Sequence, residues 1–72
     1  MNNLSARQIG WNEDVSQSKR RTVVLEGCHN RPLKAARILQ NTAKRGGSEE
    51  IRRKAKSDSN YFFNLHERNK RR

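Results

Sequence analysis

The hydrophobic positions of residues 30–47 recur with the period of an α-helix. At about 100° per residue, the small and apolar side chains fall within one arc and the basic side chains fall opposite. Pro32 suits the first helical position because its missing N–H is not needed there, and the residue before it is pushed toward the extended geometry of a cap. Gly46 or Gly47 can supply a left-handed C-cap. The pattern predicts a helix over about residues 31–45.

A second apolar stripe runs through residues 48–68. Ser48 is a good N-cap, and two acids follow it in the first turn, where the helix dipole favours negative charge. Asp58 interrupts the stripe inside "KSDSN", whose side chains compete with helical hydrogen bonds. One broken helix and two short ones, over about 48–57 and 60–69, both fit. The stripe consists of Ile51, Ala55, Phe62 and Leu65, with His66 at its edge.

These two segments predict a helical hairpin. Their apolar stripes need a partner, and the connection at the glycine pair is short enough for antiparallel neighbours. The expected core is Leu33, Ile38, Leu39, Ile51, Phe62 and Leu65, with Trp11 and residues 23–25 packed on it.

Residues 20–27, "RRTVVLEG", favour a strand. Three β-branched side chains stand together and Gly27 closes the run. The sequence therefore predicts a short strand or extended segment near residues 21–26. A strand needs a neighbour, which would come from around residues 6–11 or from another chain.

The N-terminal residues show neither a helical nor a strand period. Leu4, Ile9, Trp11 and Val15 are spaced irregularly, and turn-forming residues lie among them. Trp11 is expected to plug the core, since a small domain needs its large side chains inside; the alternative is a platform on which a base stacks.

The whole chain is predicted to be mostly α and to form one small domain. Its expected organisation is an N-terminal arm over 1–20, partly disordered or pinned by Trp11, a helical-hairpin domain over 21–69, and a frayed basic tail over 70–72.

The net charge of the chain indicates the class of its binding partner. The chain has 72 residues, with 17 Lys and Arg against 7 Asp and Glu, so its net charge is +10. Residues 1–18 hold one base and two acids, whereas residues 19–72 hold 16 bases and 5 acids. A one-sign surface costs stability through self-repulsion, which a polyanion relieves. Nucleic acid is the partner that this charge indicates first, ahead of an anionic membrane surface.

Catalytic and metal chemistry have little support in the sequence. Cys28, His29 and His66 are the only soft ligands, and they lack the paired spacings of a zinc site. We expect no enzyme, cofactor, metal or small-molecule substrate. A single cysteine excludes an internal disulfide, and the longest apolar run, residues 23–25, is far too short for a membrane span. The chain is therefore expected in the cytoplasm, without a membrane partner.

The basic faces are the candidate binding surface. Arginine forks match phosphate geometry and stack on bases. Tyr61 and Phe63 flank the apolar stripe and are candidates for stacking, although each also suits partial burial in the core. The residues expected to contact nucleic acid are Arg20, Arg21, Arg37, Lys44, Arg45, Arg52, Arg53, Lys56, Arg71 and Arg72.

Three functions remain open. The first is a small non-enzymatic protein that binds nucleic acid, with RNA or a ribonucleoprotein preferred. The second is a protein-interaction or regulatory module, of the phage or plasmid type, that docks on an acidic protein surface or dimerises through the 21–26 strand. The third is a DNA binder resembling a helix-turn-helix protein, which Glu49 and Glu50 disfavour because they would meet the phosphates.

Overall fold

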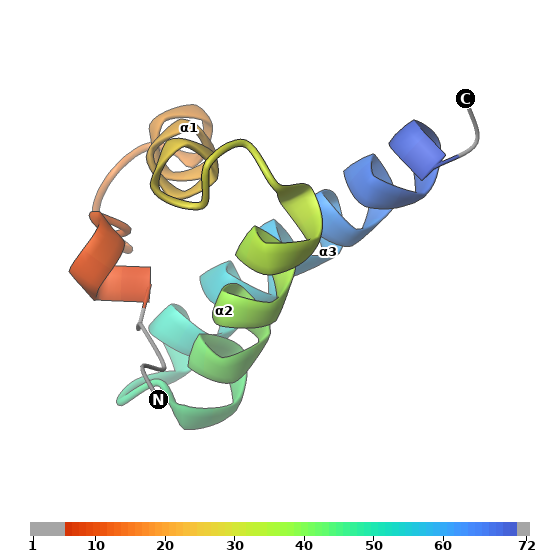
Figure 1. Cartoon of the computed structure of the whole chain (residues 1–72). Helices are drawn as coiled ribbons and strands as arrows, with labels where there is room; N and C mark the ends of the chain where they lie inside the picture. Colours follow the sequence, from red (N-terminus) through yellow and green to blue (C-terminus); the bar gives the residue numbers. More distant parts are fainter. Residues whose placement is uncertain (1–5, 71–72) are drawn as a thin grey trace.

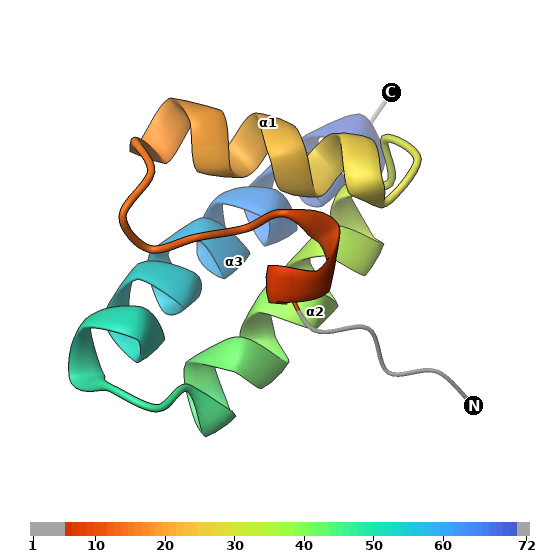
Figure 2. The same cartoon turned by 90° about the vertical axis from the view of Figure 1, so that its left-hand side faces the viewer.

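A helical hairpin forms the frame of the molecule (Figure 1). The computed structural model describes residues 6–70, and the two helices of the hairpin, α2 and α3, run antiparallel side by side (Figures 1 and 2). A further helix, α1, lies across one side of the hairpin. The predicted fold class, a mostly α small domain with a hairpin over about 31–45 and 48–68, is confirmed. The elements are η1, a 3-10 turn over Ala6–Ile9, then α1 over Gln17–Gly27, α2 over Pro32–Arg45 and α3 over Glu49–Lys70.

The segment predicted as a strand near residues 21–26 lies in helix α1, so that prediction was wrong. Its β-branched residues favour a strand locally, but the buried residues of this segment recur at every fourth position. Arg20, Val24 and Cys28 are all buried, whereas Thr22 and Glu26 between them are exposed. A strand would place all five side chains on one face, but a helix turns residues 22 and 26 away from the buried side. Ser16 caps the helix, with its Oγ accepting from the backbone N–H three residues later at 3.4 Å. Tertiary burial has overridden local propensity.

No strand occurs anywhere in residues 6–70. The expected pairing with residues 6–11 is therefore absent, and no strand edge is available there for dimerisation. The boundary placed between residues 20 and 21 falls inside α1.

The connection between α1 and α2 is a tight turn. His29 and Asn30 both adopt positive φ, at 56° and 59°, and the N–H of Asn30 donates to the carbonyl of Leu25 at 2.8 Å. Arg31 is extended, with φ −106° and ψ 99°, and Pro32 opens α2 as the sequence predicted.

The corner of the hairpin depends on Gly46 for a different reason from the one expected. Gly46 has φ −57° and ψ 145°, so the predicted left-handed cap is not formed there. A Cβ at this position would lie 2.8 Å from Cγ2 of Ile51 and 2.9 Å from the carbonyl oxygen of Thr42. Close approach of the two helices, not backbone handedness, requires glycine. Ser48 caps α3 as predicted, accepting from the N–H of Ile51 at 3.2 Å.

Helix α3 is continuous through "KSDSN". Neither the broken helix nor the pair of short helices is observed. The polar side chains in its middle bond to other elements instead of to their own backbone. Ser59 donates to the carbonyl of Ala36 in α2 at 2.8 Å, and Asp58 is bonded toward α1. Their hydrogen bonds therefore support the helix instead of interrupting it.

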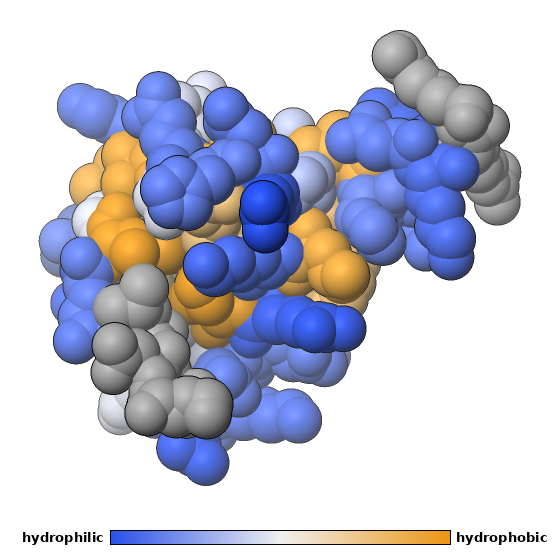
Figure 3. Space-filling model, viewed as in Figure 1, coloured by the Kyte–Doolittle hydropathy of each residue, from blue (hydrophilic) through white to orange (hydrophobic). Residues whose placement is uncertain are grey.

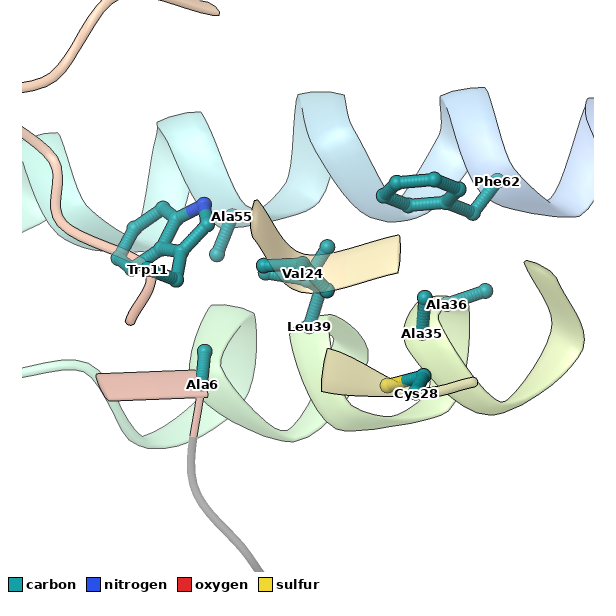
Figure 4. Packing of buried hydrophobic residues seen from close by; sticks show 9 residues of the cluster. All are labelled: Ala6, Trp11, Val24, Cys28, Ala35, Ala36, Leu39, Ala55 and Phe62. Carbon is teal, nitrogen blue, oxygen red and sulfur yellow. The ribbon is translucent and has the colours of Figure 1, made fainter. Parts of the chain in front are cut away.

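The core lies where α1 and the N-terminal segment cover the hairpin (Figure 4). Trp11 is 1% exposed, which confirms it as a core plug. Leu39 and Phe62 are buried as expected, but Ile38, Ile51 and Leu65 lie only at the margin. Small side chains take their place and let the helices approach closely. The buried apolar cluster is Ala6, Trp11, Val24, Cys28, Ala35, Ala36, Leu39, Ala55 and Phe62.

Candidate nucleic-acid interface

Five exposed basic side chains define what we call the hairpin face: Arg37 and Lys44 on α2, and Arg52, Arg53 and Lys56 on α3. Arg37 and Lys44 are seven residues apart and so lie on the same side of α2, while the bases of α3 lie within one turn of each other. All five were predicted as binding residues, and all five are exposed.

The hairpin face lies on the side opposite α1. Asp58 is bonded to α1, and its neighbour Ser59 is bonded to α2. Each residue of α3 is rotated by about 100° from the one before it. Residue 60 is therefore about 200° from Asp58 and points away from α1. Arg53 and Lys56 flank that direction. The contact between Ser59 and Ala36 also sets the antiparallel register, which puts Lys44 across from Arg52. Figure 3 shows hydrophilic side chains, with hydrophobic patches between them, on the side of the molecule where α2 lies in front of α3.

None of these five guanidinium or ammonium groups forms an ion pair with an acid in residues 6–70. Arg52 donates to the carbonyl of Gly46 at 2.8 Å, which satisfies one free carbonyl at the end of α2. The four ion pairs of the described chain lie elsewhere, and α3 begins with Glu49 and Glu50, of which Glu50 pairs with Lys54 at 2.9 Å. The hairpin face thus carries positive charge that the fold leaves uncompensated.

Other bases, both predicted and unpredicted, are exposed outside the hairpin face. Arg45 is exposed at the end of α2, beside the hairpin face. Arg71 and Arg72 lie outside the described residues. Sequence reasoning left six further exposed bases out of the binding set, although their charge alone marked them: Arg7, Lys19, Arg31, Lys34, Arg68 and Lys70.

Arg20 and Arg21 hold the fold together on the α1 side. The side chain of Arg20 is buried, and its Nε donates to Oδ2 of Asp58 at 2.9 Å while a second nitrogen donates to Oδ1 at 3.2 Å. Arg21 donates to Oδ1 of Asp58 at 2.9 Å. The indole N–H of Trp11 completes the set, donating to Oδ2 at 2.8 Å. Arg20 is thereby removed from the exposed basic surface, and we call these four side chains the Asp58 cluster.

The electrostatics of the cluster keep Asp58 ionised. Burial raises the pKa of its carboxyl group, but hydrogen bonds from Arg20, Trp11 and Arg21 outweigh burial and hold the pKa below its usual range. No buried polar side-chain atom of the described chain lacks a partner. The sequence did contain a signal for this cluster, because an acid in the middle of an apolar helical stripe needs a buried cation to face it.

The two candidate stacking residues lie on opposite sides of α3. Phe63 packs partly buried against the core. Tyr61 is 42% exposed, the only large hydrophobic side chain so exposed in residues 6–70. The guanidinium of Arg21 lies over its ring, 4.2 Å from the centroid, and the ring of Phe62 meets it edge-on at 5.1 Å. Tyr61 is thus the one aromatic ring that the fold presents to a ligand.

A cleft of about 480 Å³ opens between α1 and α3 beside Tyr61. Arg21 on α1 and Tyr61 on α3 both line it, and Leu25 and Phe62 contribute apolar surface. The remaining lining residues are polar and come from α1: Gln17, Ser18 and Thr22.

Cys28 and the histidines form no site in this structure. Cys28 is buried at the end of α1, and that burial raises the pKa of its thiol, which keeps it protonated. No cluster of three metal-ligating side chains occurs among residues 6–70. No helix within the same residues has both the length and the apolar character that crossing a membrane requires.

Comparisons with known proteins add no further assignment. No protein-family model matches the chain, and no curated protein or solved structure matches it either.

Proposed function

We propose that the protein is a small non-enzymatic RNA-binding module that holds phosphates on the hairpin face. The observation that carries this proposal is the set of five exposed bases without acidic partners, on the side of the hairpin that lies opposite α1. Phosphates would neutralise this charge and release counterions, which favours binding without a deep pocket. A lone buried thiol and an RNA partner are both compatible with the reducing cytoplasm, where we place the protein.

Two features favour backbone contacts to RNA over base reading in DNA. Helix α3 begins with Glu49 and Glu50, both exposed, where a DNA-recognition helix would touch bases. The helices of a helix-turn-helix cross at about 90–120°, whereas α2 and α3 run antiparallel (Figure 2). Structured RNA is recognised largely through its shape and its backbone, which suits a rigid basic surface.

Salt titration with matched variants tests the proposal. Arg53→Gln with Lys56→Gln removes two charges from the hairpin face, and Arg7→Gln with Lys19→Gln removes two exposed charges from η1 and α1. Binding to a labelled RNA stem-loop would be measured by fluorescence anisotropy over a range of salt concentrations. The hairpin-face variant should bind more weakly, with a slope of log affinity against log salt that is smaller by about 1.5 to 2.

In the control variant, the slope of log affinity against log salt should differ from the wild-type slope by no more than about 1, which is the change that one phosphate contact makes. Equal losses in both variants would show non-specific attraction and contradict the assignment of the hairpin face. If the affinity of the wild-type protein did not change with salt concentration, phosphate recognition would be contradicted, and docking on a protein surface would be favoured.

A further inference from the structure

The cleft between α1 and α3 is separate from the hairpin face. It opens on the α1 side of α3, whereas the hairpin-face bases on α3, Arg53 and Lys56, point away from α1. Its volume of about 480 Å³ falls within the range of small-ligand sites, about 300–1,000 Å³. The phosphate contacts proposed above make no use of it.

The stacked pair of Arg21 and Tyr61 gives the cleft a preformed flat surface. Arg21 is held by Asp58 at 2.9 Å and by the Ser57 hydroxyl at 3.4 Å, which leaves its guanidinium over the ring of Tyr61. With its amide oxygen turned toward Arg21, Gln17 accepts from both terminal guanidinium nitrogens, at 2.6 and 2.7 Å. A guanidinium fixed from three sides loses little entropy when a planar group stacks on it.

The chemistry of the walls matches a planar heterocycle. Leu25 and Phe62 supply apolar surface, and the Ser18 and Thr22 side chains add polar groups along α1. Aromatic rings and guanidinium planes are the surfaces on which unpaired bases stack, and a base in this cleft would meet both. The Asp58 cluster also contains two cations and one carboxylate, so its charge attracts the phosphates next to the base.

Helix α3 connects the cleft with the hairpin face. Arg53 and Tyr61 are eight residues apart, which is about 12 Å along the axis of α3 and about 80° around it. The axial separation alone corresponds to a minimum of about three to four stacked nucleotides at about 3.4 Å each. Arg68 is exposed two turns beyond Tyr61 on the same side of α3, within reach of a phosphate on the other side of the cleft.

From this juxtaposition we infer that the α1–α3 cleft is a nucleobase site, which takes one unpaired base of a bound RNA strand against Arg21 and Tyr61. The inference rests on the proposed RNA binding and deepens it, because it makes the preferred ligand an RNA with at least one unstacked nucleotide in place of a fully paired duplex.

The test compares two RNA duplexes, one fully paired and one that differs only by a single bulged nucleotide. Wild-type protein should bind the bulged RNA more tightly. Tyr61→Leu should lose about tenfold in affinity for that RNA while its salt slope stays unchanged, since stacking involves no counterion release. Tyr61→Phe should restore the affinity, and Phe63→Leu, which alters the aromatic ring on the other side of α3, should leave the preference for the bulge intact.

A second measurement separates the inference from the proposed function. Adenosine monophosphate, titrated at high concentration, should shift the backbone amide NMR signals of residues 17–25 and 57–62 in wild-type protein but not in Tyr61→Leu. The base site would be overturned if Tyr61→Leu left the salt-dependent binding of RNA unchanged and the nucleotide shifted no amide signals in the cleft. That result would still support the hairpin face. Nucleotide shifts in the cleft without any binding of RNA would support the base site and contradict the proposed function.

Discussion

Asp58 is the only acidic side chain that the fold buries within residues 6–70. Three donors from two other elements converge on it, so one carboxylate ties α1 and the N-terminal segment to α3. A buried ion pair adds little when it is compared with apolar packing, but removing one partner leaves a buried charge without compensation. The cluster therefore specifies how α1 is seated more than it adds net stability.

Removing the charge of Asp58 should be strongly destabilising. Asp58→Asn keeps the shape of the side chain but leaves Arg20 buried beside a neutral amide, and we expect a loss of about 3–5 kcal/mol in the free energy of unfolding, or failure to fold. Urea denaturation followed by circular dichroism measures this loss. Asp14→Asn, at an exposed acid, should change the unfolding free energy by no more than about 0.5 kcal/mol. Similar stability of both variants would mean that the cluster is not formed in solution.

Lowering the pH should remove the stability that the Asp58 cluster contributes. Because the folded protein lowers the pKa of Asp58, the carboxylate contributes stability that is present above its ordinary value of about 3.8 and is lost as the pH falls below it. The carboxyl carbon signal of Asp58, followed by NMR from about pH 7 to pH 2, should titrate below that ordinary value. In Trp11→Phe one hydrogen bond to the carboxylate is missing, and the midpoint of the Asp58 titration should move upward toward the ordinary value. A wild-type midpoint at or above the ordinary value would contradict the donor set.

At the scale of elements, the two glycines of the corner differ in what surrounds them. Gly46 faces Ile51 and the carbonyl oxygen of Thr42 within 3 Å of where a Cβ would lie, whereas Gly47 has open space around it. Gly46→Ala should therefore cost about 1–3 kcal/mol, since either α2 or α3 has to shift. Gly47→Ala should be neutral or stabilising by up to about 1 kcal/mol, because it restricts the unfolded chain. Thermal unfolding of the two variants gives the comparison, and equal effects would contradict this corner geometry.

The hairpin was predictable because its signals are local. Pro32, the amphipathic period of α2 and the Ser48 cap each act within a few residues, and each agrees with the structure. Helix α1 was not predictable in the same way. Its β-branched residues favour a strand, and the helix is specified by contacts that Arg20 and Val24 make with residues more than thirty positions away or with the core.

The candidate site divides along the same line. The bases of the hairpin face could be found from helical periodicity alone, because exposure on an amphipathic helix follows from sequence position. The cleft could not, since Arg21 and Tyr61 are forty residues apart and meet only after α1 has packed on α3. Arg20 carries the opposite lesson. Its charge resembles that of its exposed neighbours, yet an acid on another helix decides that it is buried.

At the scale of the whole molecule, the two sides of the hairpin have different charge balances. On the α1 side, Asp58 pairs with two arginines in a largely buried network and offsets part of their charge. On the other side, the bases of the hairpin face stand without acidic partners. Buried pairs are screened little by salt, whereas exposed charges are screened within a Debye length, so salt separates the two contributions.

Stability should therefore rise when salt is added to the free protein. The net charge is +10, and its mutual repulsion opposes the compact state. Raising the salt from about 0.01 M to about 0.5 M shortens the Debye length severalfold, and we expect a gain of about 1 kcal/mol, or roughly 4–8 °C in melting temperature. Arg53→Gln with Lys56→Gln should start from a higher melting temperature in low salt and gain less, because part of the repulsion is already gone. If salt instead lowered the melting temperature, attraction between surface charges would dominate, and the hairpin face would lack the uncompensated charge on which phosphate binding depends.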